Sequence, residues 1–98
     1  MKVVYRARAL ADIDGIFQFL NERSPTGARN VLRAGRDGIG DIADNPLAAQ
    51  RTSDPDIRVK MLGRYRYKIF YSVLGTELVE IIHVRHAARR PWIAPNGS

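Results

Sequence analysis

The stretch RYRYKIFYSVL, residues 64–74, most constrains what this chain can fold into, because two sets of side chains alternate along it. A period of two is typical of a strand whose two faces meet different surroundings. Gly75 and Thr76 follow, and ELVEIIHVRH, residues 77–86, is predicted as the return strand. Glycine in first place of a two-residue loop favours a type II′ turn. We therefore expect a β-hairpin in which residue 74 pairs with residue 77.

This register assigns each side chain of the hairpin to a face of the sheet, because side chains alternate along a strand. The apolar and aromatic face should carry the helices, and it includes Tyr65 opposite His86. In this register Arg66 stands directly opposite Arg85. Like charges placed directly opposite each other are destabilising, so this pair indicates a function that needs the charge. The far face is predicted to gather the pairs Phe70 and Ile81, Lys68 and His83, Arg66 and Arg85, and Arg64 and Ala87. Arg58 and Lys60 join this basic set if a strand at 57–62 buries Ile57, Val59 and Met61.

The first half of the chain predicts a strand and two helices. KVVYRA, residues 2–7, is β-branched and aromatic, as strands are. Apolar residues three and four apart predict a helix over 9–21 and a second over 25–44. Ser24 caps the second helix, Pro25 takes its first position, and a short connection favours an antiparallel helical hairpin. The buried stripes are predicted to be Leu10, Ile13, Phe17 and Leu20 in the first helix, and Ala28, Val31, Leu32, Gly35, Ile39, Ile42 and Ala43 in the second. Gly35 is expected to allow close approach of another backbone.

These elements predict one α+β domain over residues 1–98, a length that suits a single domain. Its order is an N-terminal strand, an antiparallel helical hairpin and then a three-stranded antiparallel sheet. The helices are expected to pack on one face of the sheet. Residues 93–98 are expected to form a frayed tail.

Composition excludes several classes of protein. The chain has no cysteine, which excludes disulfides and thiolate metal sites. His83 and His86 alone cannot complete a closed zinc site, so no metal or cofactor is expected. No apolar run reaches the roughly 18 residues of a membrane span, and no signal peptide is evident, so we expect a cytoplasmic protein.

Charge is distributed unevenly along the chain, whose 16 Lys and Arg against 10 Asp and Glu give a net charge of +6. Most acidic residues lie in the first 56 positions, and the later part is basic. Such a balance suits a nucleic-acid partner or an acidic protein partner. Arginine forks can stabilise a phosphodiester transition state without a metal, and His83 or His86 could exchange the proton. A binding face remains the preferred interpretation over a catalytic one.

The segments RYRYKIFYSV and VEIIHVRHAARRPW, within the predicted order of elements, resemble the RelE/ParE toxins of type II toxin–antitoxin systems. The resemblance is to the ParE-like branch and extends over residues 2–92. It implies a small basic toxin that inhibits DNA gyrase, stalls replication and arrests growth. It also implies a cognate antitoxin whose C-terminal segment wraps the toxin in a hetero-oligomer. No catalytic residues follow from this branch.

The RelE branch supplies an alternative, a metal-independent endonuclease that cuts mRNA on the ribosome. Arg58 and Lys60 match its two basic positions, and Lys68 stands where arginine is usual. Its late arginine falls around Ala87, between Arg85 and Arg89. Its late tyrosine has no match, and in the YoeB-type relatives a tyrosine follows the position of His86, where this chain has alanine. These departures weaken the nuclease hypothesis.

Three sets of residues follow from these hypotheses. Contacts to the target are predicted for Arg58, Lys60, Arg64, Arg66, Lys68, His83, Arg85, Arg89, Arg90 and Trp92. Contacts to the antitoxin are predicted for Leu10, Ile13, Phe17, Val31, Ile39 and Trp92. The nuclease alternative uses Arg58, Lys60, Arg66, Lys68, His83, Arg85 and His86.

Overall fold

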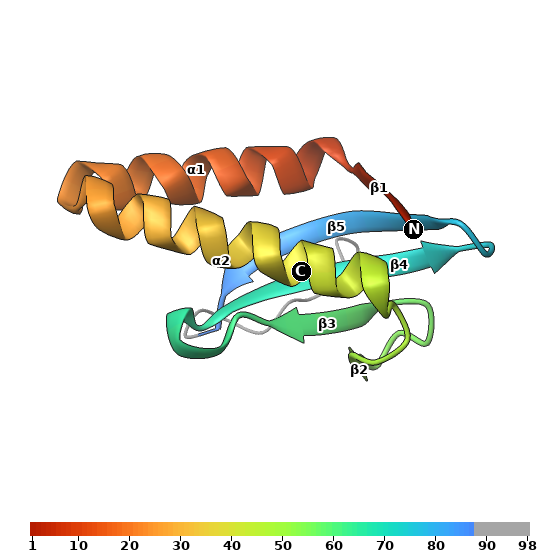
Figure 1. Cartoon of the computed structure of the whole chain (residues 1–98). Helices are drawn as coiled ribbons and strands as arrows, with labels where there is room; N and C mark the ends of the chain where they lie inside the picture. The colour runs from red at the N-terminus through yellow and green to blue at the C-terminus, as the bar shows by residue number, and fades with distance from the viewer. Residues whose placement is uncertain (88–98) are drawn as a thin grey trace.

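A computed structural model describes residues 1–87 as two layers, with two helices over one face of a sheet (Figure 1). The strands are β1 (Lys2–Tyr5), β2 (Gln50–Arg51), β3 (Arg58–Met61), β4 (Tyr67–Leu74) and β5 (Leu78–His86). The helices are α1 (Ala7–Arg23) and α2 (Pro25–Asp44), and a short 3-10 turn, η1, spans Gly63–Tyr65. The predicted α+β class, with both helices on one face, is confirmed. The predicted tail at 93–98 lies outside the described residues.

The sheet is larger than the three-stranded sheet predicted. Its order is β1-β5-β4-β3-β2, so the N-terminal strand joins as one edge and the two-residue β2 forms the other. β1 runs parallel to β5, from Lys2 opposite Leu78 to Tyr5 opposite Ile81. The antiparallel core of β3, β4 and β5 is present as expected. Sequence patterns identified β1 as a strand, but a strand's pattern does not name its partner.

Both helices form close to their predicted bounds. The Ser24 hydroxyl accepts a hydrogen bond of 3.0 Å from the Gly27 N–H, which confirms it as the cap of α2. The buried stripe of α1 differs from the prediction, because Ala9 is fully buried and Leu10 is 54% exposed. A small residue at position 9 lets α1 lie close to the sheet.

No other backbone approaches Gly35 as expected, and the tightest contact at a glycine of α2 is that of the Leu62 side chain with Gly38. A Cβ built on Gly38 would lie 2.6 Å from the Leu62 Cδ2 atom, whereas one on Gly35 would lie 4.0 Å from Leu62 Cδ1. Gly38 is buried, one turn closer to the C-terminal end of α2. The glycine that permits tight packing of α2 is therefore Gly38.

The register of the hairpin differs from the prediction in two places. Three residues, 75–77, form the turn, and Leu74 pairs with Leu78 rather than with Glu77. A β-bulge then shifts the register again between Phe70 and Tyr71, so that Phe70 pairs with His83. Ile82 is the extra residue on β5. The predicted pairs of Lys68 with His83 and of Arg66 with Arg85 are therefore wrong.

The strand predicted to begin at residue 64 begins at Tyr67 instead. Residues 63–65 form η1, and Arg66 adopts a left-handed conformation with φ of 61°. A residue with positive φ cannot continue a strand, because the chain turns there. The Leu62 N–H closes this turn with a 2.8 Å hydrogen bond to the Tyr67 carbonyl, and Ala87 N–H donates to the Arg66 carbonyl.

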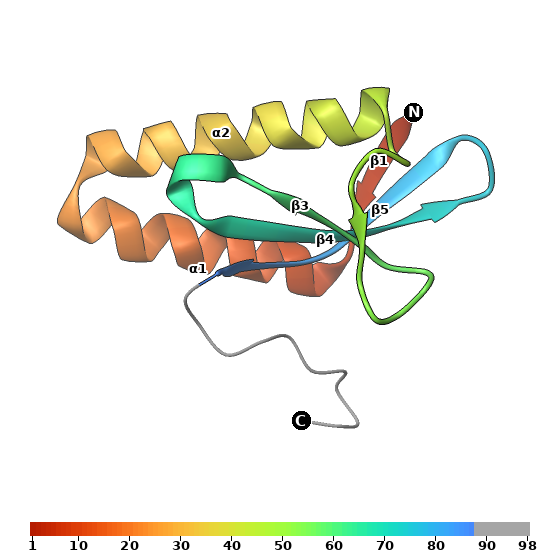
Figure 2. The ribbon, with the colours of Figure 1, turned by 90° about the horizontal axis from the view of Figure 1, so that it is seen from below.

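The two faces of the sheet carry separate apolar clusters. We call the face under the helices the helix-side face; there Ile69, Tyr71, Val79, Ile81 and Val84 pack with Ala9 and Ile42. The opposite or far face holds a smaller cluster of Ile57, Phe70 and Ile82, with Val59 beside it. Seen from below, β4 and β5 cross in front of α1, and most of α2 lies beside the strands (Figure 2). The main core is therefore on the helix-side face.

Candidate functional site

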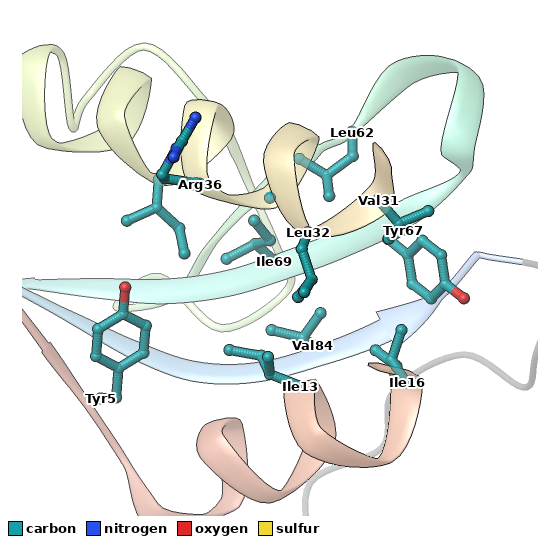
Figure 3. Close-up of a pocket in the computed structure, with 12 residues that line it drawn as sticks. Tyr5, Ile13, Ile16, Val31, Leu32, Arg36, Leu62, Tyr67, Ile69 and Val84 are labelled. Atoms are coloured by element: carbon teal, nitrogen blue, oxygen red, sulfur yellow. The ribbon is translucent and has the colours of Figure 1, made fainter. Parts of the chain in front are cut away.

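An apolar groove opens between the two helices and the sheet (Figure 3). Its volume is about 230 Å³. Figure 3 shows side chains of α1 and α2 facing those of β4 and β5 across the open space. The groove is lined by Tyr5, Ile13, Ile16, Val31, Leu32, Gly35, Arg36, Ile39, Leu62, Tyr67, Ile69 and Val84. Arg36 is the one charged side chain among these lining residues.

Apolar side chains at the mouth of this groove are in contact with water. Leu32 is 38% exposed and Tyr5 is 40% exposed. Gly35 contributes no side chain, and the space above it is open apart from Leu62 at 4.0 Å. Contiguous exposed apolar surface in a concave site marks a place where another molecule binds. The groove is therefore the best candidate on the helix-side face for a protein partner.

Three of the residues predicted for the antitoxin interface line this groove: Ile13, Val31 and Ile39. Leu10 and Phe17 do not line it, and Trp92 lies outside the described residues. Ile16, Leu62 and Tyr67 also line the groove and were not among the predicted residues. Ile13 and Ile16 are three apart, so an α1 stripe that began at Ala9 would have included Ile16.

A second groove lies on the far face and is cationic. It is lined by Gln50, Arg51, Thr52, Ser53, Val59, Met61, Lys68, Phe70 and Arg85. Lys68 of β4 stands directly opposite Arg85 of β5. The like-charge pair that was predicted as Arg66 and Arg85 therefore exists, but with Lys68 as the partner of Arg85.

Arg58 and Lys60 do not join this basic set, contrary to the prediction. They pair with Tyr71 and Ile69, whose side chains lie in the helix-side core. The Arg58 guanidinium donates to the carbonyls of Leu47 (3.1 Å) and Ala49 (2.8 Å). Lys60 forms a 3.8 Å ion pair with Asp41 of α2. Val59 and Met61 are on the far face instead, so the alternation of β3 is reversed from the expectation.

The remaining basic residues also separate. Arg64 lies in η1 and Arg66 at the turn that follows it, and both are exposed. Arg89, Arg90 and Trp92 lie outside the described residues. Of the residues predicted to contact the target, the structure thus brings Lys68 and Arg85 together with His83 on one face.

His83 is buried rather than open on that face. Its side chain is 7% exposed, and its Nδ1 lies 2.6 Å from the Asp12 carboxylate of α1. The same carboxylate oxygen accepts the Val84 backbone N–H at 3.0 Å. The His83 ring also stacks on Phe70, with centroids 5.7 Å apart. This geometry pins α1 to β5, which was not predicted for His83.

His86 lies on the helix side, as predicted, but its partner is Tyr67 and not Tyr65. The two rings meet edge to face at 5.0 Å between centroids. The groups of the nuclease alternative are thus divided between both faces and the η1 turn. Among residues 1–87, no three His, Asp or Glu side chains are placed to hold a metal ion. Neither helix in this part of the chain is long and apolar enough to span a membrane.

Tyr71, in the helix-side core, has a shifted pKa. Burial raises the pKa of the Tyr71 phenol above its ordinary value of 10.0, while the charge of Arg58 acts in the opposite direction. The Tyr71 hydroxyl donates a 2.6 Å hydrogen bond to the Pro46 carbonyl. Tyr71 and Arg58 together hold the loop after α2 against the sheet.

Comparison with known families identifies the family of this chain. The family model described as the ParE toxin of type II toxin–antitoxin system, parDE, matches residues 3–91. The chain belongs to the ParE toxin family. Membership confirms the resemblance to ParE-like toxins of type II toxin–antitoxin systems that is seen in the sequence.

A solved structure supports the fold of this ParE-family chain. The structure is described as the chromosomal ParDE TA system from P. aeruginosa, and the two chains share 19% sequence identity. The TM-score is 0.75, with 88% of this chain and 95% of that chain covered. At this identity the likeness establishes the fold alone. No curated protein matched the chain.

Proposed function

We propose that the chain is the toxin of a type II toxin–antitoxin module that inhibits DNA gyrase in the cytoplasm and so arrests growth. The observation that carries this proposal is the match to the ParE toxin family over residues 3–91. The division of basic residues between two faces supports it, because Arg58 and Lys60 are engaged on the helix side. The proposed action is through binding, with the far face and its Lys68 and Arg85 as the surface toward the target.

We further propose that the cognate antitoxin binds in the apolar groove. An amphipathic segment could bury its apolar side chains between α1 and α2, as helices do in grooves of this kind. Ile13, Val31 and Ile39 would contact it from both helices. Neutralisation follows if the bound segment also covers surface that the target needs.

The target is tested by inducing the chain in bacterial cells and then assaying the purified protein. We expect growth arrest, stalled replication and loss of supercoiling by gyrase, with intact message. Cleavage of mRNA at the ribosomal A site, mapped by primer extension within minutes of induction, would support the nuclease alternative instead. Normal gyrase activity in the presence of excess toxin would contradict the proposal.

The antitoxin site is tested by filling the groove from Gly35. Gly35→Leu places a side chain into open space, because only Leu62 approaches a Cβ there. Gly40→Leu is the matched control, since it lies on α2 outside the groove with nothing within 4 Å of its Cβ. Both changes raise helix propensity by about 1 kcal/mol, so folding is favoured equally. We expect the Gly35 variant to escape neutralisation on co-expression with antitoxin, whereas the Gly40 variant should remain neutralised. Equal neutralisation of both would place the antitoxin elsewhere.

A further inference from the structure

Three arginines form a row along the exposed side of α2, next to the apolar groove. Arg29, Arg33 and Arg36 are exposed, and they are four and three residues apart. Residues with this spacing lie on one side of a helix, here over about 10 Å of its length. Arg36 also lines the groove, and Figure 3 shows its guanidinium pointing away from the apolar side chains. We call these three residues the arginine row.

The charge of the arginine row is poorly balanced by the described part of the chain. Within residues 1–87, Arg29 and Arg33 form no ion pair, and Arg29 donates to the Thr26 hydroxyl at 3.4 Å. Arg36 Nε lies 3.9 Å from the Asp37 carboxylate, and a pair of such exposed side chains contributes little. Like charges three and four residues apart destabilise a helix. The stability of α2 therefore does not explain the row.

The arginine row and the apolar groove form one continuous surface. Leu32 is three residues after Arg29 and four before Arg36, so its side chain lies beside both on the helix. Leu32 lines the groove and is 38% exposed. Among the described residues, no acidic side chain lines the groove. A partner that covers the apolar side chains is therefore brought next to the guanidinium groups.

An acidic amphipathic helix is the partner that fits this surface. Apolar side chains at positions i, i+3, i+4 and i+7 of a helix fill a groove of this kind. Carboxylates with the same spacing would each face one arginine when the partner helix lies along α2, and arginine binds carboxylates through two parallel hydrogen bonds. An extended strand repeats every two residues and does not match the row. A nucleic-acid backbone has the charge but no apolar stripe for the groove.

We propose that the arginine row selects the partner of the apolar groove, an amphipathic helix with carboxylates along the edge that faces α2. This inference rests on the proposed function, because it takes the antitoxin segment to bind in the groove and names the charge pattern of that segment. The apolar contacts supply most of the affinity. The row supplies specificity, because a basic edge opposite it is repelled. Carboxylates moved by one position turn about 100° around the partner helix and lose the row.

Synthetic peptides of about 20 residues, or about 30 Å of helix, test this selection on the purified chain. The acidic peptide has leucines at i, i+3, i+4 and i+7 and glutamates along one edge of that stripe. Two matched peptides have glutamine or lysine in place of every glutamate. Isothermal titration calorimetry measures the affinity of each peptide.

The test variant removes the arginine row by Arg29→Gln, Arg33→Gln and Arg36→Gln. The control variant removes the same charge from three exposed residues that do not line the groove, by Lys2→Gln, Arg8→Gln and Arg64→Gln. We expect the test variant to bind the acidic peptide about tenfold more weakly than the wild type, because each exposed ion pair contributes about twofold. The control variant should lose little affinity. The difference should disappear near 1 M salt, where charges are screened beyond about 3 Å.

Charge reversal separates recognition of charge from loss of fold. A chain with glutamate at all three positions of the arginine row should bind the lysine peptide more tightly than the acidic one. The wild type should show the opposite preference. A reversal of preference requires a folded groove in both proteins.

The inference is overturned if none of the peptides binds, if the glutamine peptide binds the wild type as tightly as the acidic peptide, or if the test and control variants lose affinity equally. Gly35→Leu distinguishes these failures from failure of the proposed antitoxin site. If Gly35→Leu abolishes binding while the test variant binds like the wild type, the groove holds the partner and the row does not select it. If Gly35→Leu binds like the wild type, the partner binds outside the groove. A dimer of the chain alone that Gly35→Leu dissociates would show that a second copy fills the groove.

Discussion

The two faces of the sheet differ in burial and in how their basic side chains are engaged, although the same strands form both. The helix-side face buries Tyr71, Ile69 and Ile81 completely or almost so, and its cations are engaged with carbonyls or with Asp41. The far face has a small apolar cluster and holds Lys68 against Arg85. The difference teaches that basic residues close in sequence can have opposite roles. Arg58 and Lys60 secure the fold, whereas Lys68 and Arg85 stand opposite each other and line the far-face groove.

The strongest test of this contrast is truncation of Tyr71 on the helix-side face. Tyr71→Ala should lower the free energy of unfolding by about 3–5 kcal/mol, because a fully buried aromatic ring leaves a cavity. Urea denaturation measures the change. A loss below about 1 kcal/mol would show that the helix-side core does not carry the stability of the domain.

The second largest loss of stability is expected when the contact of Asp12 in α1 with His83 and Val84 in β5 is removed. Asp12→Ala removes the acceptor of both His83 and the Val84 N–H, and each buried group left without it costs about 1–3 kcal/mol. Chemical denaturation measures the loss, and Asp37→Ala, an exposed residue of α2, is the matched control. Equal stability of the two variants would mean that the edge of β5 gains nothing from α1.

Alkaline pH provides a third test of the helix-side core. Burial raises the pKa of Tyr71, so the folded chain keeps this proton at a pH where the unfolded chain, with a pKa of 10.0, releases it. The stability from Tyr71 is therefore fully present below that pH and declines as the pH rises through the folded pKa. The decline should not exceed about 1.4 kcal/mol per pH unit for one proton. Denaturation curves at increasing pH should show this component in the wild type and lack it in Tyr71→Phe.

The smallest effect, and the one of opposite sign, is expected on the far face. Lys68→Ala should leave stability unchanged or raise it by about 0.2–1 kcal/mol, because it relieves the repulsion from Arg85. Lys60→Ala on the helix side should instead lose the weak ion pair with Asp41, at a cost of about 0.5 kcal/mol. Thermal unfolding of both variants decides the matter. If Lys68→Ala proves the less stable of the two variants, repulsion between Lys68 and Arg85 does not destabilise the far face.

Local patterns predicted the elements well, since periodicity and caps are local properties. The bounds of α2 and its Ser24 cap were correct, and so was the class of the fold. Pairing was not predictable, because it depends on distant residues. The parallel partner of β1 and the extra strand β2 had no signal in the sequence. The consecutive Ile81 and Ile82 suit either face, so alternation did not reveal the bulge.

The far-face positions of His83 and Arg85 were nevertheless predicted correctly, and the reason is geometric. The three-residue turn shifts the register by one residue, and the bulge at Ile82 shifts it by another. Two shifts restore the original alternation, so His83, Arg85 and His86 keep their predicted faces while their partners change. The burial of His83 could not be predicted, because its partner Asp12 lies 71 residues away in sequence.

The place where β1 ends has a consequence for the chain in isolation. β1 covers β5 only as far as Ile81, and Arg6 N–H closes that pairing on the Ile81 carbonyl. Within residues 1–87, β5 beyond this point is an outer strand whose backbone groups could recruit a strand from another molecule, the route by which sheets aggregate. The Asp12 carboxylate occupies the Val84 amide at that edge. The Asp12 side chain of α1 thus takes the place of a neighbouring strand at Val84. It opposes pairing of this edge of β5 with another molecule.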